Sequence, residues 1–243
     1  MTTSLAGFAQ VAAQGILDES SSQLHTLGTY METADGRGFR YGKVGAVATV
    51  AGKVYQGPAL DATNMQPSGG LTPAAAAIGD TSITISTSTT LAVNLLAGGY
   101  MSVVVTPGQG YTYRIKGNTA TAGAAGLVVT LEDPLKVALT TSSRVIFTRH
   151  PYDGVVIEPG TPTARIAGVP TAIITAAYFG WLQTKGPCAV LFTGTGVAGK
   201  VVGSLSGGTS GSMAPAIAAT NIGGEHMATG ITGEYSLIYL RID

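Results

Sequence analysis

Hydrophobic and polar positions alternate in short runs along most of the chain. From Gly38 onward these runs are rich in β-branched and aromatic residues and end at Gly, Pro, Asn or Asp, which is typical of β-strands. The segment 82–87, SITIST, alternates strictly, so one of its faces should be buried and the other exposed to solvent. The predicted strands are 39–41, 44–50, 54–56, 82–86, 100–106, 112–116, 126–131, 144–148, 154–157, 172–175, 178–184, 189–192, 200–202 and 235–242.

Helix signals are restricted to three short segments. In residues 6–17, the side chains of Phe8, Val11, Ile16 and Leu17 would fall on one stripe of a helix. The other two segments are 73–78 and 135–138, and nowhere do helices and strands alternate regularly. We therefore predict an all-β protein with an antiparallel β-sandwich or barrel-like body, an extended N-terminal arm and few short helices.

The arm covers residues 1–35, which hold no convincing strand. An arm of this kind gains little from folding back on its own domain, so we expect it to reach across a subunit boundary. The body divides into a first β module, 36–160, and a second, 161–243, although a single β body over 36–243 also fits the pattern. Residues 57–79 are the best internal linker, and 203–214 have the composition of a flexible surface loop.

Composition narrows the classes of partner. Only 11% of the 243 residues are charged, against about 25% in an ordinary soluble domain. The 13 Lys and Arg balance the 13 Asp and Glu, so we expect no nucleic-acid partner. No window is apolar enough to span a bilayer and the N-terminus lacks the basic region of a secretory signal, so we expect no membrane partner.

Two sequence features resemble reactive or nucleotide-binding sites. The single cysteine, Cys188, lies in the apolar run PCAVLF and is predicted to be a buried, inert thiol. Residues 194–200, GTGVAGK, match glycine patterns of nucleotide-binding loops. Such loops must open a helix, whereas VVGSLSGG follows here, and Val201 replaces the Ser or Thr that would hold magnesium. We predict a glycine-rich hairpin turn and expect no cofactor.

Catalytic and metal sites are equally poorly supported. The three histidines, His25, His150 and His226, have no further His or Cys at metal-site spacing, so no metal site is expected. The carboxylate pairs at 18–19 and 132–133 lie in the arm and before Pro134, where neither is a good active site. We expect no catalytic residues and no small-molecule substrate.

Aromatic residues at 178–181 are instead predicted to fill a core or a subunit interface. The candidate interface residues are Phe8, Val11, Ile16, Leu17, Tyr178, Phe179 and Trp181.

Several stretches taken together resemble a known group of proteins. They are GRGFRYGKVG at 36–45, GGYMSVVVTPGQGYTYRIKGN at 98–118, LEDPLKVALTTSSRVIF at 131–147, HPYDGVVIEPG at 150–160, YFGWLQTKGPCAVL at 178–191 and GEYSLIYLRID at 233–243. Together they resemble tailed-bacteriophage structural proteins that decorate or cement the icosahedral head.

This resemblance implies a non-catalytic virion protein, made in the bacterial host cytoplasm and placed on the outer surface of the phage head. Its partners would be the major capsid protein, whose neighbouring subunits it bridges, and other copies of itself, most simply in a homotrimer.

Two other function classes remain open. A trimeric phage fibre or receptor-binding module shares the β content and the Thr and Gly richness, but fibres usually show repeats, and none is found here. A glycan or cell-wall hydrolase would need two well-placed acids, and no carboxylates in this sequence stand out for that role.

Overall fold

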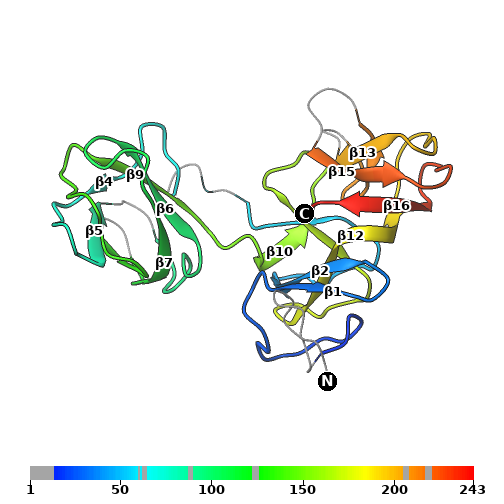
Figure 1. Cartoon of the computed structure of the whole chain (residues 1–243), viewed down its shortest axis with the longest axis horizontal. Helices are drawn as coiled ribbons and strands as arrows, with labels where there is room; N and C mark the ends of the chain where they lie inside the picture. The colour runs from blue at the N-terminus through cyan, green and yellow to red at the C-terminus, as the bar shows by residue number, and fades with distance from the viewer. Residues whose placement is uncertain are drawn as a thin grey trace, which may run out of the picture. The chain divides into compact units, whose positions relative to one another are not determined.

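The computed structural model describes residues 14–59, 61, 65–86, 90–121, 126–204, 208–216 and 221–243. Contacts between residues divide the chain into unit 1, residues 1–59 with 151–243, and unit 2, residues 60–150. The described residues are all-β and contain no helix, which confirms the predicted fold class. Figure 1 labels most of the strands.

Unit 2 is a six-stranded antiparallel sheet whose strand order is β4-β5-β8-β7-β6-β9. A bridge between Leu71 and Val145 joins the residue before β4 to β9, so the sheet curls back on itself. Residues of β5 are alternately exposed and buried, as the strict alternation at 82–87 predicted. The strands are β4 (Thr72–Pro73), β5 (Ser82–Ser86), β6 (Tyr100–Val105), β7 (Thr112–Asn118), β8 (Leu127–Leu131) and β9 (Arg144–Thr148).

The two short helices predicted at 73–78 and 135–138 do not form. Pro73 belongs to strand β4, and Ala76 exchanges two backbone hydrogen bonds with Leu139, at 3.0 and 2.9 Å. The two segments thus satisfy their backbone groups across the unit rather than within a helical turn. Of the helix predicted at 6–17, residues 14–17 are not helical, with a turn at 16–17, and the rest lies outside the described residues.

Unit 1 contains the other ten strands, in one sheet of order β1-β2-β10-β3-β11-β12-β16-β15-β13-β14. An additional pairing of β2 with β12 closes β2, β10, β3, β11 and β12 into a ring, and only the β2–β10 pair is parallel. The strands are β1 (Tyr30–Glu32), β2 (Gly38–Val44), β3 (Tyr55–Gln56), β10 (Asp153–Ile157), β11 (Ile166–Pro170), β12 (Phe179–Leu191), β13 (Val201–Ser204), β14 (Ala214–Pro215), β15 (Asn221–His226) and β16 (Tyr235–Arg241).

Strand β12 organises unit 1. Its 13 residues were predicted as two strands, but they run without a break through Gly186 and Pro187. The first part pairs with β2 and the second with β16, and the pairing with β2 shifts register between Gln183 and Lys185. The strand predicted at 172–175 is absent, and β11 lies just before it.

The contacts contradict the module boundary predicted near residue 160. Strand β3 pairs with both β10 and β11, so strands on the two sides of residue 160 belong to one sheet. Unit 1 is therefore built from two separated pieces of chain. The predicted linker 57–79 does contain the first passage between the units, but residues 65–79 form part of unit 2.

The described part of the predicted arm folds back on its own unit. Residues 30–32 form β1 against β2, and Ser20 exchanges backbone hydrogen bonds of 3.0 and 2.9 Å with Phe179. Residues 14–35 therefore lie against the unit of their own chain, and the expectation that the arm reaches across a subunit boundary stays a prediction. Residues 1–13 lie outside the described part.

Candidate functional site

The aromatic residues singled out as an interface form a small core beneath the N-terminal segment. Phe179 and Trp181 are buried with Phe39 and Tyr41, and Ile16 packs against them from outside. The indole nitrogen of Trp181 donates a hydrogen bond of 3.2 Å to the backbone carbonyl of Gln14. Within this chain, Phe179 and Trp181 are thus core residues that anchor residues 14–20.

The other predicted interface residues are dispersed. Tyr178 is partly buried and packs against a neighbouring core cluster, whereas Leu17 is 63% exposed. Phe8 and Val11 lie outside the described residues. Of the described members of this set, Leu17 presents the most surface to a partner, and the sequence pattern did not distinguish it from its buried neighbours.

Unit 1 carries a hollow of about 360 Å³ on its surface, a size within the range of ligand pockets. Its walls come from the turn between β1 and β2, the turn before β3, the end of β11, and strands β12 and β16. Arg37 and Thr171 contribute polar groups, while Pro187, Ala189 and the ring of Tyr235 are apolar. This combination can bind an apolar group that also offers hydrogen-bond acceptors.

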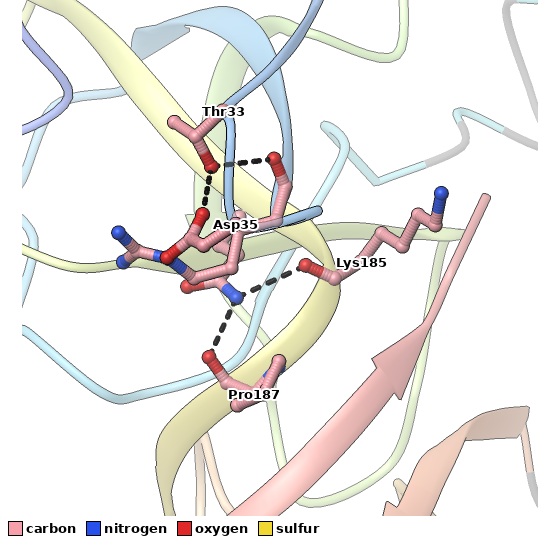
Figure 2. A network of polar contacts seen from close by, with 6 residues as sticks. Thr33, Asp35, Lys185 and Pro187 are labelled. Carbon is pink, nitrogen blue, oxygen red and sulfur yellow. Dashed lines mark hydrogen bonds and ion pairs between the residues drawn. The ribbon is translucent and has the colours of Figure 1, made fainter.

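A polar network shapes one side of the hollow (Figure 2). Thr33 donates from its hydroxyl to Asp35, and Arg37 donates from Nε to the same carboxylate at 2.7 Å. The hydrogen bond from Thr33, together with Arg37, lowers the pKa of Asp35, so this carboxylate stays ionised and neutralises the guanidinium. The turn thus presents Arg37 at the hollow without net charge.

Gln183 makes a second set of hydrogen bonds, which Figure 2 also shows. Its buried amide nitrogen donates to the backbone carbonyls of Lys185 at 3.0 Å and Pro187 at 2.8 Å. These bonds tie two carbonyls of β12 to Gln183, next to the register shift between Gln183 and Lys185. A polar residue within the run FGWLQTKGP was the signal that could have identified this position from the sequence.

Cys188 is a buried free thiol that lines the hollow, which confirms the predicted burial. Burial raises the pKa of Cys188 to about 12, although Arg37 acts in the opposite direction. The thiol is therefore protonated at neutral pH and is a poor nucleophile, since thiolates are the reactive form.

An apolar strip continues from the hollow onto the outer face of the sheet. We call Pro187, Ala189, Tyr235, Leu237 and Met227 the apolar face. Ala189 lies opposite Leu237, whose carbonyl accepts a hydrogen bond from the amide of Met227, so these side chains share one side of the sheet. Leu237 is 43% exposed, Met227 46% and Tyr235 50%. An ion pair between Glu225 and Arg241 borders the face, with 2.9 Å between its atoms.

Two buried ionisable side chains lie elsewhere in unit 1. Glu158 follows β10 and contacts the segment around Gly211, and burial raises its pKa to about 7. His226 packs edge-on against Phe192, with 4.3 Å between ring centroids, and burial lowers its pKa. The side chain of His226 is only 3% exposed.

The glycine-rich segment 194–200 joins β12 to β13 and is followed by a strand, as predicted. It is not a simple hairpin, because β12 and β13 do not pair with each other. Instead, Gly196 forms a bridge to Gly230. A Cβ atom on either glycine would clash with the ring of His226, which explains the need for glycine at both positions.

Within the described ranges, no group of three His, Cys, Asp or Glu side chains could hold a metal ion. Nor do these ranges contain a helix with the length and hydropathy that a membrane-spanning segment requires. No family model matches the chain, and no match was found among curated proteins or among solved structures.

Proposed function

We propose that this chain is a non-catalytic structural virion protein that decorates the head of a tailed phage. In this role it binds the outer surface of the shell and bridges neighbouring subunits of the major capsid protein. The resemblance of most of residues 36–243 to head decoration proteins suggests the role, and the apolar face carries the structural argument.

Exposed apolar side chains that share one side of a sheet are typical of a surface that another protein covers. In the apolar face, the exposed side chains of Tyr235, Leu237 and Met227 lie close together. The ion pair of Glu225 and Arg241 lies at its border, where the two charges cancel. The centre of a protein interface is commonly apolar and poor in charged residues. We therefore assign the capsid contact to this face.

The low content of charged residues also suits a protein that bridges capsid subunits. Contacts between neutral surfaces change little with ionic strength, whereas exposed ion pairs are screened by salt. Many weak contacts repeated over a shell can add stability to the particle without any chemical step. We propose a homotrimer because a protein that fills a three-fold junction shares the symmetry of that junction.

The test is to mix purified protein with undecorated shells of the phage that encodes it and to image the particles by electron microscopy. We expect saturable density on the outer surface, retained when the salt concentration is raised. In solution, the particle mass should be three times the 24.4 kDa of the chain.

Two variants sharpen this test. Leu237→Asp places a charge in the apolar face and should abolish the density. Val93→Asp adds the same charge at an exposed position of unit 2 and should leave it unchanged. Bare shells with the native protein would overturn the proposal, and protein found on the tail of virions would favour a fibre or receptor-binding role.

A further inference from the structure

We propose that copies of this chain contact one another through an apolar surface that lies on three loops of unit 1. We call the exposed side chains of Leu17, Val47, Val50 and Ile173 the loop surface. The assignment rests on the self-association in the proposed function, and it does not depend on the capsid contact.

Two of the three loops are joined by reciprocal hydrogen bonds. The amide of Thr49 donates to the carbonyl of Ile174 at 2.8 Å, and the amide of Ile174 donates to the hydroxyl of Thr49 at 2.7 Å. Val47 and Val50 therefore lie on a loop that is fixed beside the loop of Ile173.

The third loop, which carries Leu17, is joined to the loop of Ile173 at two points. The hydroxyl of Thr171 donates to the carbonyl of Ile16 at 3.3 Å, and the hydroxyl of Thr175 donates to the carboxylate of Glu19 at 2.9 Å. Ile173 thus lies on the loop that contacts both of the others.

The side chains of the loop surface face solvent. Ile173 is 68% exposed and Val47 is 77% exposed, whereas Ile174, the next residue after Ile173, is buried in a core cluster of unit 1. Apolar side chains that gather at the solvent side of adjacent loops are typical of a surface that another protein covers.

The lack of charged residues favours a second copy of this chain as that protein. The stretches 44–52 and 166–184 contain no Asp, Glu, Lys or Arg. Near a symmetry axis a residue meets its own equivalent from another copy, so a charged side chain there would face a like charge. An uncharged surface meets its own copy without that repulsion.

The border of the loop surface has the charges that a contact between copies requires. Asp18 follows Leu17, and Lys53 follows the stretch 44–52. Neither side chain forms an ion pair with any residue that the structure describes. Because each copy carries both signs, the acid of one copy can pair with the base of another and orient the contact.

The apolar face differs in this respect. The ion pair of Glu225 and Arg241 at its border is closed within one chain. It leaves no unpaired charge there to orient a second copy, so the loop surface is the better candidate for self-association.

Sedimentation equilibrium of the purified full chain over a range of concentrations tests the proposal. The native protein should form a particle with a multiple of the 24.4 kDa mass of one chain. Ile173→Asp should raise the dissociation constant about thirtyfold or more, as expected for a residue at the centre of an interface.

Ile78→Asp is the matched control. It replaces the same residue type at the same exposed fraction, 68%, but in unit 2, and it should leave the dissociation constant unchanged. Hydrogen exchange locates the contact, because peptides covering 45–50 and 171–177 should exchange more slowly in the native particle than in Ile173→Asp.

Each outcome bears on the proposal. A native mass of one chain at every concentration overturns it, as do equal dissociation constants for Ile173→Asp and Ile78→Asp. If Ile173→Asp does not fold, Val47→Asp takes its place with the same expected loss, and a native dissociation constant for that variant overturns the proposal.

The capsid contact can fail separately. Leu237→Asp should keep the native mass, and its dispersal of the particle while Ile173→Asp remains assembled would place the contact on the apolar face and overturn the inference. A particle that disperses in Ile173→Asp and not in Ile78→Asp supports the loop surface even where capsid shells stay bare.

Discussion

Replacing Trp181 by Ala tests whether the aromatic cluster is the core of unit 1 or a surface for a partner. The side chain is 1% exposed, with its ring centroid 5.1 Å from that of Tyr41 and 5.4 Å from that of His25. Its indole nitrogen also anchors the carbonyl of Gln14. The substitution therefore creates a cavity and removes the hydrogen bond that holds the N-terminal segment.

The expected loss in the free energy of unfolding is about 4 kcal/mol, within the range of about 3–5 kcal/mol for truncating a buried Trp or Phe to Ala. Single domains are stable by about 5–15 kcal/mol, so this loss is a large share of the total. For a unit of this size it corresponds to a fall in melting temperature of about 10 °C. Trp181→Phe keeps a ring in the core and should cost roughly 1–2 kcal/mol.

Hydrogen exchange read by mass spectrometry, combined with denaturant unfolding, measures this loss and locates it. Amides of unit 1 should lose protection in Trp181→Ala, while amides of unit 2 serve as an internal reference because that unit has its own core. Tyr100→Ala, which truncates an exposed aromatic residue, should change stability by no more than about 0.5 kcal/mol. A loss below about 1 kcal/mol for Trp181→Ala would refute the assignment of this residue to the core.

Three further predictions concern buried groups and backbone geometry. Burial raises the pKa of Glu158 to about 7, so the folded state loses stability as the pH rises from the ordinary glutamate range through 7. Glu158→Gln should be more stable than the native protein by on the order of 2–3 kcal/mol at pH 8 and nearly equal to it at pH 4, as denaturant unfolding at the two pH values can show. Burial lowers the pKa of His226, so stability should fall as the pH drops below about 6.5. His226→Gln should flatten that part of the pH–stability curve, and an unchanged slope would contradict the argument. Gly52→Ala should destabilise by about 1–3 kcal/mol, because φ is +74° and a Cβ atom would lie 2.6 Å from the ring of Tyr235. Gly36→Ala has a similar φ of +82° but open space around it, so its smaller loss in a thermal melt isolates the clash.

The sequence predicted only part of the candidate site. The turn that carries Arg37 and the burial of Cys188 follow from local patterns, namely a glycine-rich ADGRG and an apolar run around the thiol. That these two residues line one hollow with Tyr235 depends on the pairing of β12 with β16, which brings together residues far apart in the chain. The sequence around each residue does not show which distant residues will lie beside it.

The burial of His226 shows the same limit. In the sequence it stands among Gly, Glu and Met, a setting that resembles a solvated loop. In the structure its ring fits against Phe192, because Gly196 and Gly230 have no side chains to exclude it. The burial of His226 depends on Gly196, Gly230 and Phe192 lying together in the fold. It therefore cannot be predicted from the residues next to His226 in the sequence.

The sequence alone determined that the protein is all-β and placed strands such as 82–86, 144–148 and 235–241 closely, because side-chain alternation is a local property of a strand. The tertiary structure decided that unit 1 is assembled from two pieces of chain, that residues 14–35 pack on their own unit, and that Phe179 and Trp181 belong to a core. These outcomes depend on which strands pair over long separations. Such pairing is set by the apolar surface buried by the whole chain, which no short stretch of residues specifies.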